Sequence, residues 1–171
     1  ASLYSFVVAL AVYDVVAQIL PRADIKIKWP NDVLVAGKKI CGILLEAAPI
    51  KEEIIDWLVL GAGINIAWHP DNALYATTDL ITQGAENIDV SKVLEIYLEK
   101  IDQWRLSLKQ DGFDSLRQAW LARARKGVIT ARLSSGEMKG QFAGLDEIGR
   151  LLLDCDDGTR KTISSADVFF E

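Results

Sequence analysis

The hydrophobic and polar positions change their period along the chain, beginning with a long apolar stretch. Leu3–Ala17 has Asp14 as its only charged residue, a pattern typical of a buried helix. Ser2 is a suitable N-cap, and Pro21 ends the helix after about Leu20. The stretch has no basic leader and is too short and interrupted to span a bilayer. The pattern therefore predicts a buried helix and no membrane association.

Short alternating segments follow this helix and predict a group of strands. Trp29–Asp32 interrupts the first alternation, and the turn residues 36–39 join two further segments into a hairpin. A later apolar strand contains Gly61 and Gly63. The predicted strands cover residues 25–28, 33–35, 40–46 and 58–68.

A helical period returns after a loop at residues 69–90. Ser91 is predicted to open a helix whose apolar positions follow helical spacing. Gly112 breaks this helix, and a second one is predicted from about Phe113 to Arg125. The apolar positions of the first helix are Val93, Leu94, Tyr97, Ile101, Trp104 and Leu108.

The pattern changes again from Gly127 onward. Short strands alternate with turn residues at 134–136, 146–149 and 156–158, a spacing of about eleven residues that is typical of a small β-barrel. We therefore predict a domain boundary near Lys126, with one domain at residues 1–126 and a barrel at 127–171.

Composition and charge narrow the classes of function. The 171 residues carry a net charge of −5, which gives no electrostatic footprint for a nucleic-acid partner. Cys41 and Cys155 have no CxxC spacing and are interpreted as reduced thiols of a cytoplasmic protein. His69 is the only histidine and lacks the companions that a zinc site or a catalytic triad needs. Arg117, Arg123, Arg125 and Lys126 are interpreted as solvated surface.

The segment Lys28-Trp29-Pro30-Asn31-Asp32 is the most unusual part of the sequence. It places a cation, an aromatic ring, an amide and a carboxylate at the end of a strand, where active groups are common. The structural alternative is that Pro30 and Asn31 form a turn, Trp29 lies in the core and Asp32 caps the turn.

Two strands contain glycines that would leave space above a sheet. Gly42 follows Lys39 by three residues, and Gly61-Ala62-Gly63 precedes Asn65, so alternation places Gly61, Gly63 and Asn65 on one face of their strand. Glycine in a strand admits a ligand or a closely packed neighbour, and a lysine beside such a space can hold a carboxylate or phosphate. The alternatives are a lysine that solvates the hairpin tip and glycines that pack against a helix. The pattern is not a phosphate-binding P-loop.

Taken together, these motifs resemble those of the biotin–protein ligases. The matching residues are Lys28-Trp29-Pro30-Asn31-Asp32, Lys39 with Gly42-Ile43-Leu44, Gly61-Ala62-Gly63-Ile64-Asn65 and, for the SH3-like barrel of that family, Phe142–Asp146, Gly149 and Leu151–Asp154. The resemblance implies an α+β fold, in which a mixed sheet flanked by helices forms an incomplete class II synthetase-like biotin/lipoate ligase core. A C-terminal SH3-like β-barrel follows this core.

The resemblance also implies a reaction and its participants. ATP and biotin form biotinyl-AMP with the help of Mg²⁺, and a lysine of the biotin carrier domain of a carboxylase then receives biotin. Lys39 and Asp32 are the implied catalytic residues, with Asp32 also a candidate metal ligand. The implied biotin-binding residues are Lys39, Gly42, Leu44, Gly61 and Ala62, and the implied nucleotide-binding residues are Lys28, Asn31 and Asn65.

The sequence departs from this family in one respect. No Arg-Gly-Arg occurs in it, whereas the family has an arginine- and glycine-rich loop and a Ser/Thr-Asn segment upstream of the matched motifs. We therefore expect half a pocket, as in a fragment of a longer enzyme or in an inactive protein. Nothing indicates the DNA-binding repressor role of some family members. The alternatives are a lipoate–protein ligase, a non-catalytic module that binds a carrier or forms a homodimer, and an SH3-like adaptor.

Overall fold

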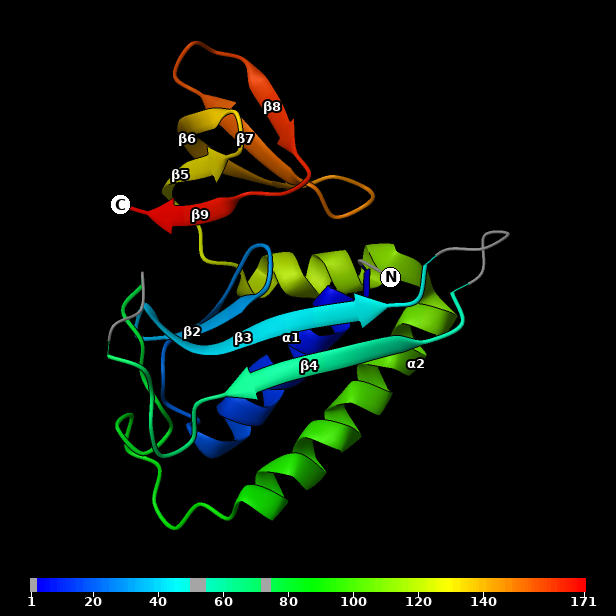
Figure 1. Cartoon of the computed structure of the whole chain (residues 1–171), viewed down its shortest axis with the longest axis vertical. Helices are drawn as coiled ribbons and strands as arrows, with labels where there is room; N and C mark the ends of the chain where they lie inside the picture. Colours follow the sequence, from blue (N-terminus) through cyan, green and yellow to red (C-terminus); the bar gives the residue numbers. More distant parts are fainter. Residues whose placement is uncertain (1–2, 50–54, 72–74) are drawn as a thin grey trace.

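The first part of the chain is a four-stranded antiparallel sheet with both helices on one of its faces. The computed structural model describes residues 3–49, 55–71 and 75–171 (Figure 1). The strand order is β1-β2-β3-β4, so β4 is an outer strand. The elements are α1 (Leu3–Ile19), β1 (Ile25–Lys28), β2 (Asp32–Val35), β3 (Lys38–Ala47), β4 (Leu58–Ile64) and α2 (Val90–Arg123).

Helix α1 is the buried helix that its composition predicts. Nine of its residues are buried, and it contacts α2 and all four strands of the sheet. The predicted cap at Ser2 lies outside the described residues. No helix in the described part of the chain is long and apolar enough to cross a membrane.

The β2–β3 hairpin has a tighter turn than the sequence predicts. Ala36 and Gly37 both have positive φ, at 49° and 75°, and Val35 pairs directly with Lys38. Positive φ at both central residues is the requirement of a type I′ turn, whose twist matches that of the strands. Lys38 and Lys39 therefore belong to β3 and not to the turn.

Two predicted element ends were wrong. Strand β4 ends at Ile64, not at Trp68: Asn65 still donates to the Ile40 carbonyl of β3, but the Asn65 and Ile66 carbonyls accept from the amides of Leu80 and Ile81. Helix α2 is capped by Asp89, whose side chain accepts a hydrogen bond from the Ser91 amide, so Ser91 is not the N-cap. The predicted break at Gly112 is confirmed by its non-helical φ of 75°.

The C-terminal module, from Val128 to Phe170, is a five-stranded antiparallel sheet above the first part of the chain (Figure 1). Its order is β8-β7-β6-β5-β9, and no ladder joins the outer strands β8 and β9 in the described residues, so the sheet does not close into a complete barrel. The strands are β5 (Val128–Leu133), β6 (Gly136–Leu145), β7 (Leu151–Cys155), β8 (Arg160–Ile163) and β9 (Asp167–Phe170).

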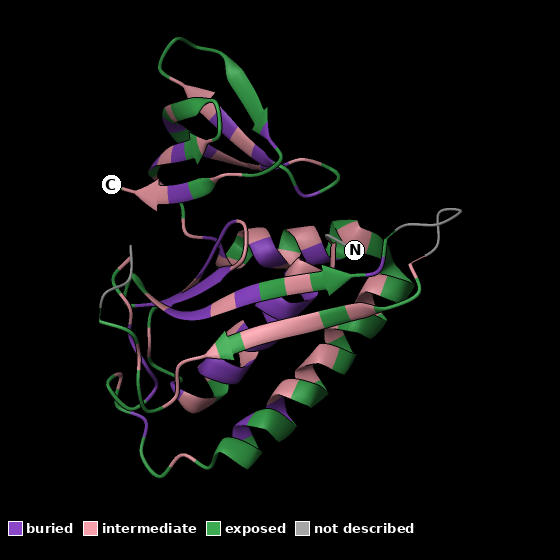
Figure 2. Ribbon diagram, in the orientation of Figure 1, coloured by how far each residue is buried: buried purple, intermediate pink, exposed green. Residues whose placement is uncertain are grey.

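The hydrophobic core continues from one sheet to the other. Figure 2 shows buried positions in both, and the Phe6 and Trp120 rings meet edge to face at 5.7 Å while Trp120 also contacts Phe142 of β6. The Trp29 indole N–H donates to the Gly149 carbonyl at 3.1 Å. These contacts connect the two parts of the chain, and the boundary near Lys126 stays a prediction.

The interpretation of the arginine cluster as solvated surface was wrong for three of its members. Arg117 donates to the Leu145 carbonyl, and Arg125 lies 4.4 Å from the ring centroid of Phe170. Arg123 lies 5.0 Å from the ring centroid of Tyr13. A guanidinium group stacks readily on an aromatic face, as Arg125 does on Phe170. This stacking and the hydrogen bond from Arg117 both connect the end of α2 to the C-terminal module.

Candidate functional site

A carboxylate held between two lysines is the centre of the candidate site. Asp32 Oδ2 lies 3.0 Å from Lys28 Nζ, and Asp32 Oδ1 lies 2.6 Å from Lys39 Nζ. The register of the sheet produces this arrangement, because Asp32 pairs with Lys28 on β1 and with Gly42 on β3. The Lys28 and Asp32 side chains are 6% and 5% exposed, whereas Lys39 is 30% exposed. Lys39 is therefore the cation that a ligand can reach.

The charges of this triad favour an anionic ligand. Two ammonium groups and one carboxylate leave one net positive charge, in a site where Lys28 and Asp32 are desolvated. Burial lowers the pKa of Lys28, although the Asp32 carboxylate opposes this shift. A buried ion pair needs close geometry to offset its desolvation, and the Lys28 contact supplies it at one oxygen, whereas the other oxygen is near Lys39 but accepts no hydrogen bond from the described residues.

The turn that carries Asp32 is fixed to β3. The Asn31 side-chain amide donates to the Ile43 carbonyl at 2.7 Å, and the Ile43 amide donates to the Asn31 carbonyl at 2.9 Å. Trp29 is buried, as predicted, and the Trp29–Pro30 peptide bond is cis. The Asn31 side chain is thus engaged in holding the turn, and its nucleotide-binding role stays a prediction.

The strand glycines form an open floor beside Lys39. Gly42 pairs with Gly63, and Leu44 pairs with Gly61, so these four residues share the face of the sheet that the helices leave free. Leu44 is 66% exposed there. Ala62 pairs with the buried Ile43 and packs against the core on the opposite face. The structure therefore does not bring the Ala62 side chain together with the other predicted biotin-binding residues.

Gly42 leaves the space that the Lys39 side chain occupies. A Cβ at position 42 would lie 3.1 Å from both Cε and Nζ of Lys39, closer than ordinary contact. The absence of a side chain at Gly42 thus permits Lys39 to reach Asp32. This explains, in terms of space, why a glycine follows the lysine by three residues.

A short segment after β4 completes the wall of the site. The Lys39 amide donates to the Ala76 carbonyl at 2.8 Å, and the Thr78 amide donates to the Lys39 carbonyl at 2.9 Å. The Asn65 side chain donates to the Thr78 carbonyl at 2.9 Å. A cavity of about 260 Å³ results, lined by Lys39, Gly42, Gly63, Asn65, Pro70, Tyr75 and Thr77.

Asp79 holds the segment after β4 in place through its side-chain contacts. Its buried carboxylate accepts hydrogen bonds from the Thr82 backbone and hydroxyl, and it pairs with His69. Burial alone would raise the pKa of Asp79, but the hydrogen bonds from Thr82 and His69 outweigh it and hold that pKa below its usual value. Sequence reasoning missed Asp79, because an acidic residue in an irregular segment gives no periodic signal.

A second depression lies between the two parts of the chain. Its volume is about 250 Å³, and Lys28, Lys39 and Arg125 line it together with Tyr75 and the end of β9. The Lys28 ammonium lies 3.9 Å from the centroid of the Tyr75 ring. Sequence reasoning also missed Tyr75, since its importance comes only from its position beside residues far away in the chain.

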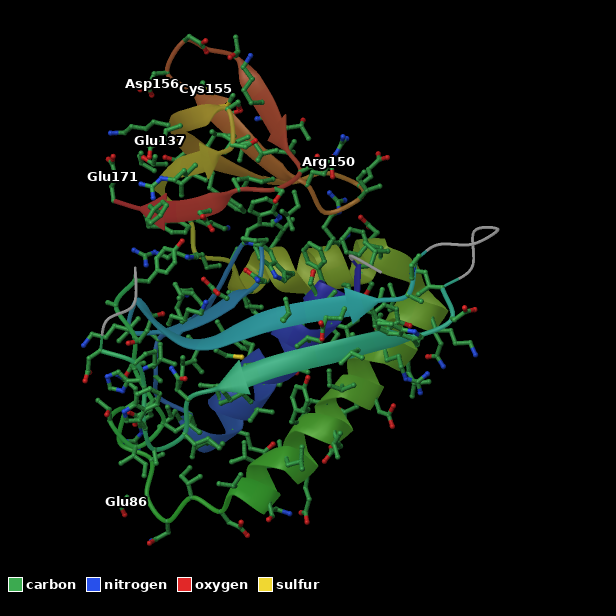
Figure 3. All side chains as sticks on the ribbon, in the orientation of Figure 1. Glu86, Glu137, Arg150, Cys155, Asp156 and Glu171 are labelled. Carbon is green, nitrogen blue, oxygen red and sulfur yellow. The ribbon has the colours of Figure 1, made fainter. Side chains whose placement is uncertain are left out.

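The cysteines are placed where neither acts as a nucleophile of this site. Cys41 on β3 and Cys155 on β7 are free thiols in different sheets, and Figure 3 labels Cys155 in the C-terminal sheet. Cys41 is 1% exposed on the core face, and burial, aided by the Asp32 charge, raises its pKa to about 12. A thiol that stays protonated is a poor nucleophile, so Cys41 is a packing residue.

The described residues contain no group of three or more acidic, histidine or cysteine side chains that would hold a metal ion. The two oxygens of Asp32 lie close to lysine ammonium groups, but Oδ1 is buried and has no hydrogen-bond partner among the described residues, so the metal-ligand role of Asp32 stays a prediction.

Comparison with known families identifies the class to which this fold and site belong. The family described as "Biotin/lipoate A/B protein ligase family" matches residues 1–122, and the "Biotin protein ligase C terminal domain" matches residues 129–171. The chain belongs to the biotin/lipoate protein ligase family. The resemblance drawn from its motifs is thereby confirmed, as is the α+β fold class with an SH3-like C-terminal part.

Individual relatives agree with this assignment. The chain is 38% identical over 174 residues to the biotin–[acetyl-CoA-carboxylase] ligase of Paracoccus denitrificans, covering 97% of this chain and 72% of that protein. It is 34% identical to the bifunctional ligase/repressor BirA of Bacillus subtilis, covering 93% of this chain and 51% of the relative. The chain thus spans only part of the length of each.

A solved structure has the same fold. The apo biotin protein ligase from Aquifex aeolicus superimposes with a TM-score of 0.83 at 25% identity, over 99% of this chain and 76% of that one. The Aquifex protein has also been solved in complex with biotin and ATP, where the identity is 24% and the TM-score 0.80, over 99% of this chain and 72% of that one.

Proposed function

We propose that this chain carries the reaction centre of a biotin–protein ligase. A carboxylate oxygen of biotin attacks the α-phosphorus of ATP, which forms the acyl-phosphate anhydride of biotinyl-AMP and releases pyrophosphate. The amine of a carrier lysine then attacks the carbonyl carbon, loses a proton and forms an amide, and AMP leaves. The observation that carries the proposal is the Lys28–Asp32–Lys39 triad beside the glycine floor.

The proposed roles follow from exposure and position. Lys39, the more exposed cation of the triad, binds the carboxyl end of biotin and stabilises the charge that develops on the oxygens during adenylation. Asp32 holds both lysines in place and orients the incoming carrier lysine. Gly42, Leu44 and Gly61 form the biotin floor, to which Ala62 contributes its backbone.

The nucleotide is proposed to lie on the side of the triad that faces the C-terminal module. Lys28 borders the depression there and supplies a positive charge, while Asn31 and Asn65 position the loops on either side. Mg²⁺ accompanies ATP in many phosphoryl-transfer sites, held by the phosphates and one or two carboxylates. Asp32, whose Oδ1 has no hydrogen-bond partner among the described residues, is the candidate carboxylate for that role, and no step of the proposal depends on a metal ion.

The proposed partner is the biotin carrier domain of a carboxylase, and the proposed location is the cytoplasm. The relative from Paracoccus is named for acetyl-CoA-carboxylase, which supports a carrier of that class. The homodimer that the sequence left open as an alternative would form at β4, an outer strand of the sheet in the described residues, because strand edges offer backbone groups for pairing.

Thermal unfolding with ligand tests the proposal directly. A non-hydrolysable biotinyl-AMP analogue at a hundred times its dissociation constant is expected to stabilise the chain by about 2.7 kcal/mol. The lipoyl analogue is the control, and a shift with it alone would instead favour a lipoate–protein ligase. A shift with the biotinyl compound without biotin-dependent ATP–pyrophosphate exchange would favour a non-catalytic module. No shift with either compound would refute the proposal for this chain.

Replacing Gly42 with alanine is expected to slow adenylation about tenfold with little loss of stability. The new Cβ meets the mobile end of Lys39 and not the backbone, so the fold accommodates it by moving Lys39 away from Asp32. The unfolding free energy should change by less than about 1 kcal/mol. ATP–pyrophosphate exchange and urea unfolding measure the two quantities.

Gly63→Ala is the matched variant for this prediction. Its added Cβ would lie 3.7 Å from the Gly42 carbonyl oxygen, an ordinary contact, and would leave Lys39 in place. We expect a smaller loss of adenylation than for Gly42→Ala. Equal losses would mean that crowding of the floor, and not displacement of Lys39, controls the rate.

A further inference from the structure

An aromatic ring of the C-terminal module lies against the ring that covers Lys28. The Phe169 and Tyr75 rings stack with centroids 5.1 Å apart and an interplanar angle of 27°. Tyr75 in turn has the Lys28 ammonium 3.9 Å from its ring centroid. A continuous set of contacts therefore runs from β9 through Tyr75 to the buried cation of the triad.

The described hydrogen bonds of the segment that follows Tyr75 begin at Ala76 and Thr77 and do not include the Tyr75 side chain. The next residue, Ala76, is exposed, and its carbonyl accepts the hydrogen bond from the Lys39 amide. Among the described residues, the Tyr75 ring contacts the Phe169 ring on the C-terminal module and the Lys28 ammonium group. The C-terminal module therefore supports the ring over Lys28.

Phe169 is not required for the core of its own sheet. Its neighbour Val168 is the buried residue of β9, at 2% exposure, and successive residues of a strand point to opposite faces. Phe169 is only partly buried, and the Arg132 guanidinium group lies 4.6 Å from its ring centroid. The pairing of Phe169 with Thr130 on β5 fixes where its ring is presented.

We propose that Phe169 is a positioning residue of the candidate active site, holding Tyr75 over Lys28 so that Lys28 stays on Asp32. A cation near a ring face is attracted more strongly when water is excluded, and Lys28 is almost fully buried. Removal of the Phe169 ring frees Tyr75, admits water to Lys28 and loosens the triad. The catalytic consequence rests on the proposed ligase function, whereas the structural consequence does not.

Lysine labelling tests the structural consequence without any need for activity. The full chain and its Phe169→Leu variant are acetylated briefly with an amine-reactive ester, and labelling of Lys28 is measured relative to Lys26 by mass spectrometry. Lys26 lies on the same strand and is 45% exposed, so it reports the reagent's intrinsic rate. The ratio is expected to rise at least about threefold in Phe169→Leu. An unchanged ratio would overturn the proposal.

Two further variants separate positioning from general loosening. Phe169→Tyr keeps a ring and should restore the parent ratio. Tyr13→Leu removes another aromatic ring that has a guanidinium group near its face, outside the candidate site, and should leave the ratio unchanged. A rise in Tyr13→Leu equal to that in Phe169→Leu would contradict a specific role for Phe169.

The catalytic consequence is tested by biotin-dependent ATP–pyrophosphate exchange under conditions where all variants are folded. Phe169→Leu and Tyr75→Leu should each lower kcat about tenfold, and the double variant should be no slower than either single one. Additive losses would show that Phe169 acts independently of Tyr75 and would overturn the proposal. Absence of exchange in the parent would refute the ligase function, while the labelling result would still decide the positioning role.

Discussion

Replacing Lys39 with methionine is expected to lower the rate of biotinyl-AMP formation by roughly 10²–10³-fold, the usual loss when one preorganised stabilising donor is removed. Methionine keeps the length and apolar stem of lysine but has no charge. Lys39 is the partly exposed cation of the triad, 2.6 Å from Asp32, and it borders both depressions of the site. Asp32 retains Lys28 as a partner, so the fold should survive.

Lys38→Met is the matched control for this change. Lys38 is the preceding residue of β3 and is exposed, so the substitution removes the same charge from the same hairpin without touching Asp32. Its adenylation rate should stay within about twofold of the parent rate. ATP–pyrophosphate exchange measures both variants, and equal losses would show that the total charge of the hairpin matters more than the position of Lys39.

Most of the secondary structure could be predicted from the sequence, because the residue patterns that specify helices, strands and turns are local. The break at Gly112 and the turns of the C-terminal module depend on residues whose backbone preferences act within a few positions. The end of β4 could not be predicted in this way. It is decided by the segment at Leu80 and Ile81, whose amides donate to the Asn65 and Ile66 carbonyls, and no local pattern reports these partners.

Only those features of the candidate site that follow from its motifs and from strand alternation could be predicted from the sequence. Alternation placed Gly61 and Gly63 on one face, as the register has them. The same alternation places Ala62 on the opposite face, which the motif-based prediction overlooked. The pairing of Asp32 with both lysines could not be deduced, because it requires the register of three strands to be known.

Contacts between the two parts of the chain were the least predictable feature. Trp29 was correctly predicted to be buried, but its hydrogen-bond partner, Gly149, lies 120 residues further on. Arg117 and Arg125 are charged residues of the kind that usually lie on a solvated surface, yet they contact the C-terminal module. Long-range contacts of this kind depend on how two folded sheets meet, which the sequence pattern of either one does not specify.

Substitution of Gly149 by alanine is expected to destabilise the whole chain by about 2–5 kcal/mol, the sum of a left-handed backbone penalty and overpacking. Gly149 has φ of 85°, and an added Cβ would lie 2.7 Å from two ring atoms of Phe6. That ring cannot easily move, since Phe113 and Trp120 contact it edge to face at 5.1 and 5.7 Å.

The effect should extend to the candidate site, because the Gly149 carbonyl accepts the hydrogen bond of Trp29, three residues before Asp32. Gly158→Ala isolates the backbone penalty: Gly158 has φ of 79° but no atom within 4 Å of an added Cβ, so its cost should be about 1–2 kcal/mol. Urea unfolding of both variants gives the difference. Equal costs would show that the Phe6 ring yields, and that the junction between the two sheets tolerates crowding at this point.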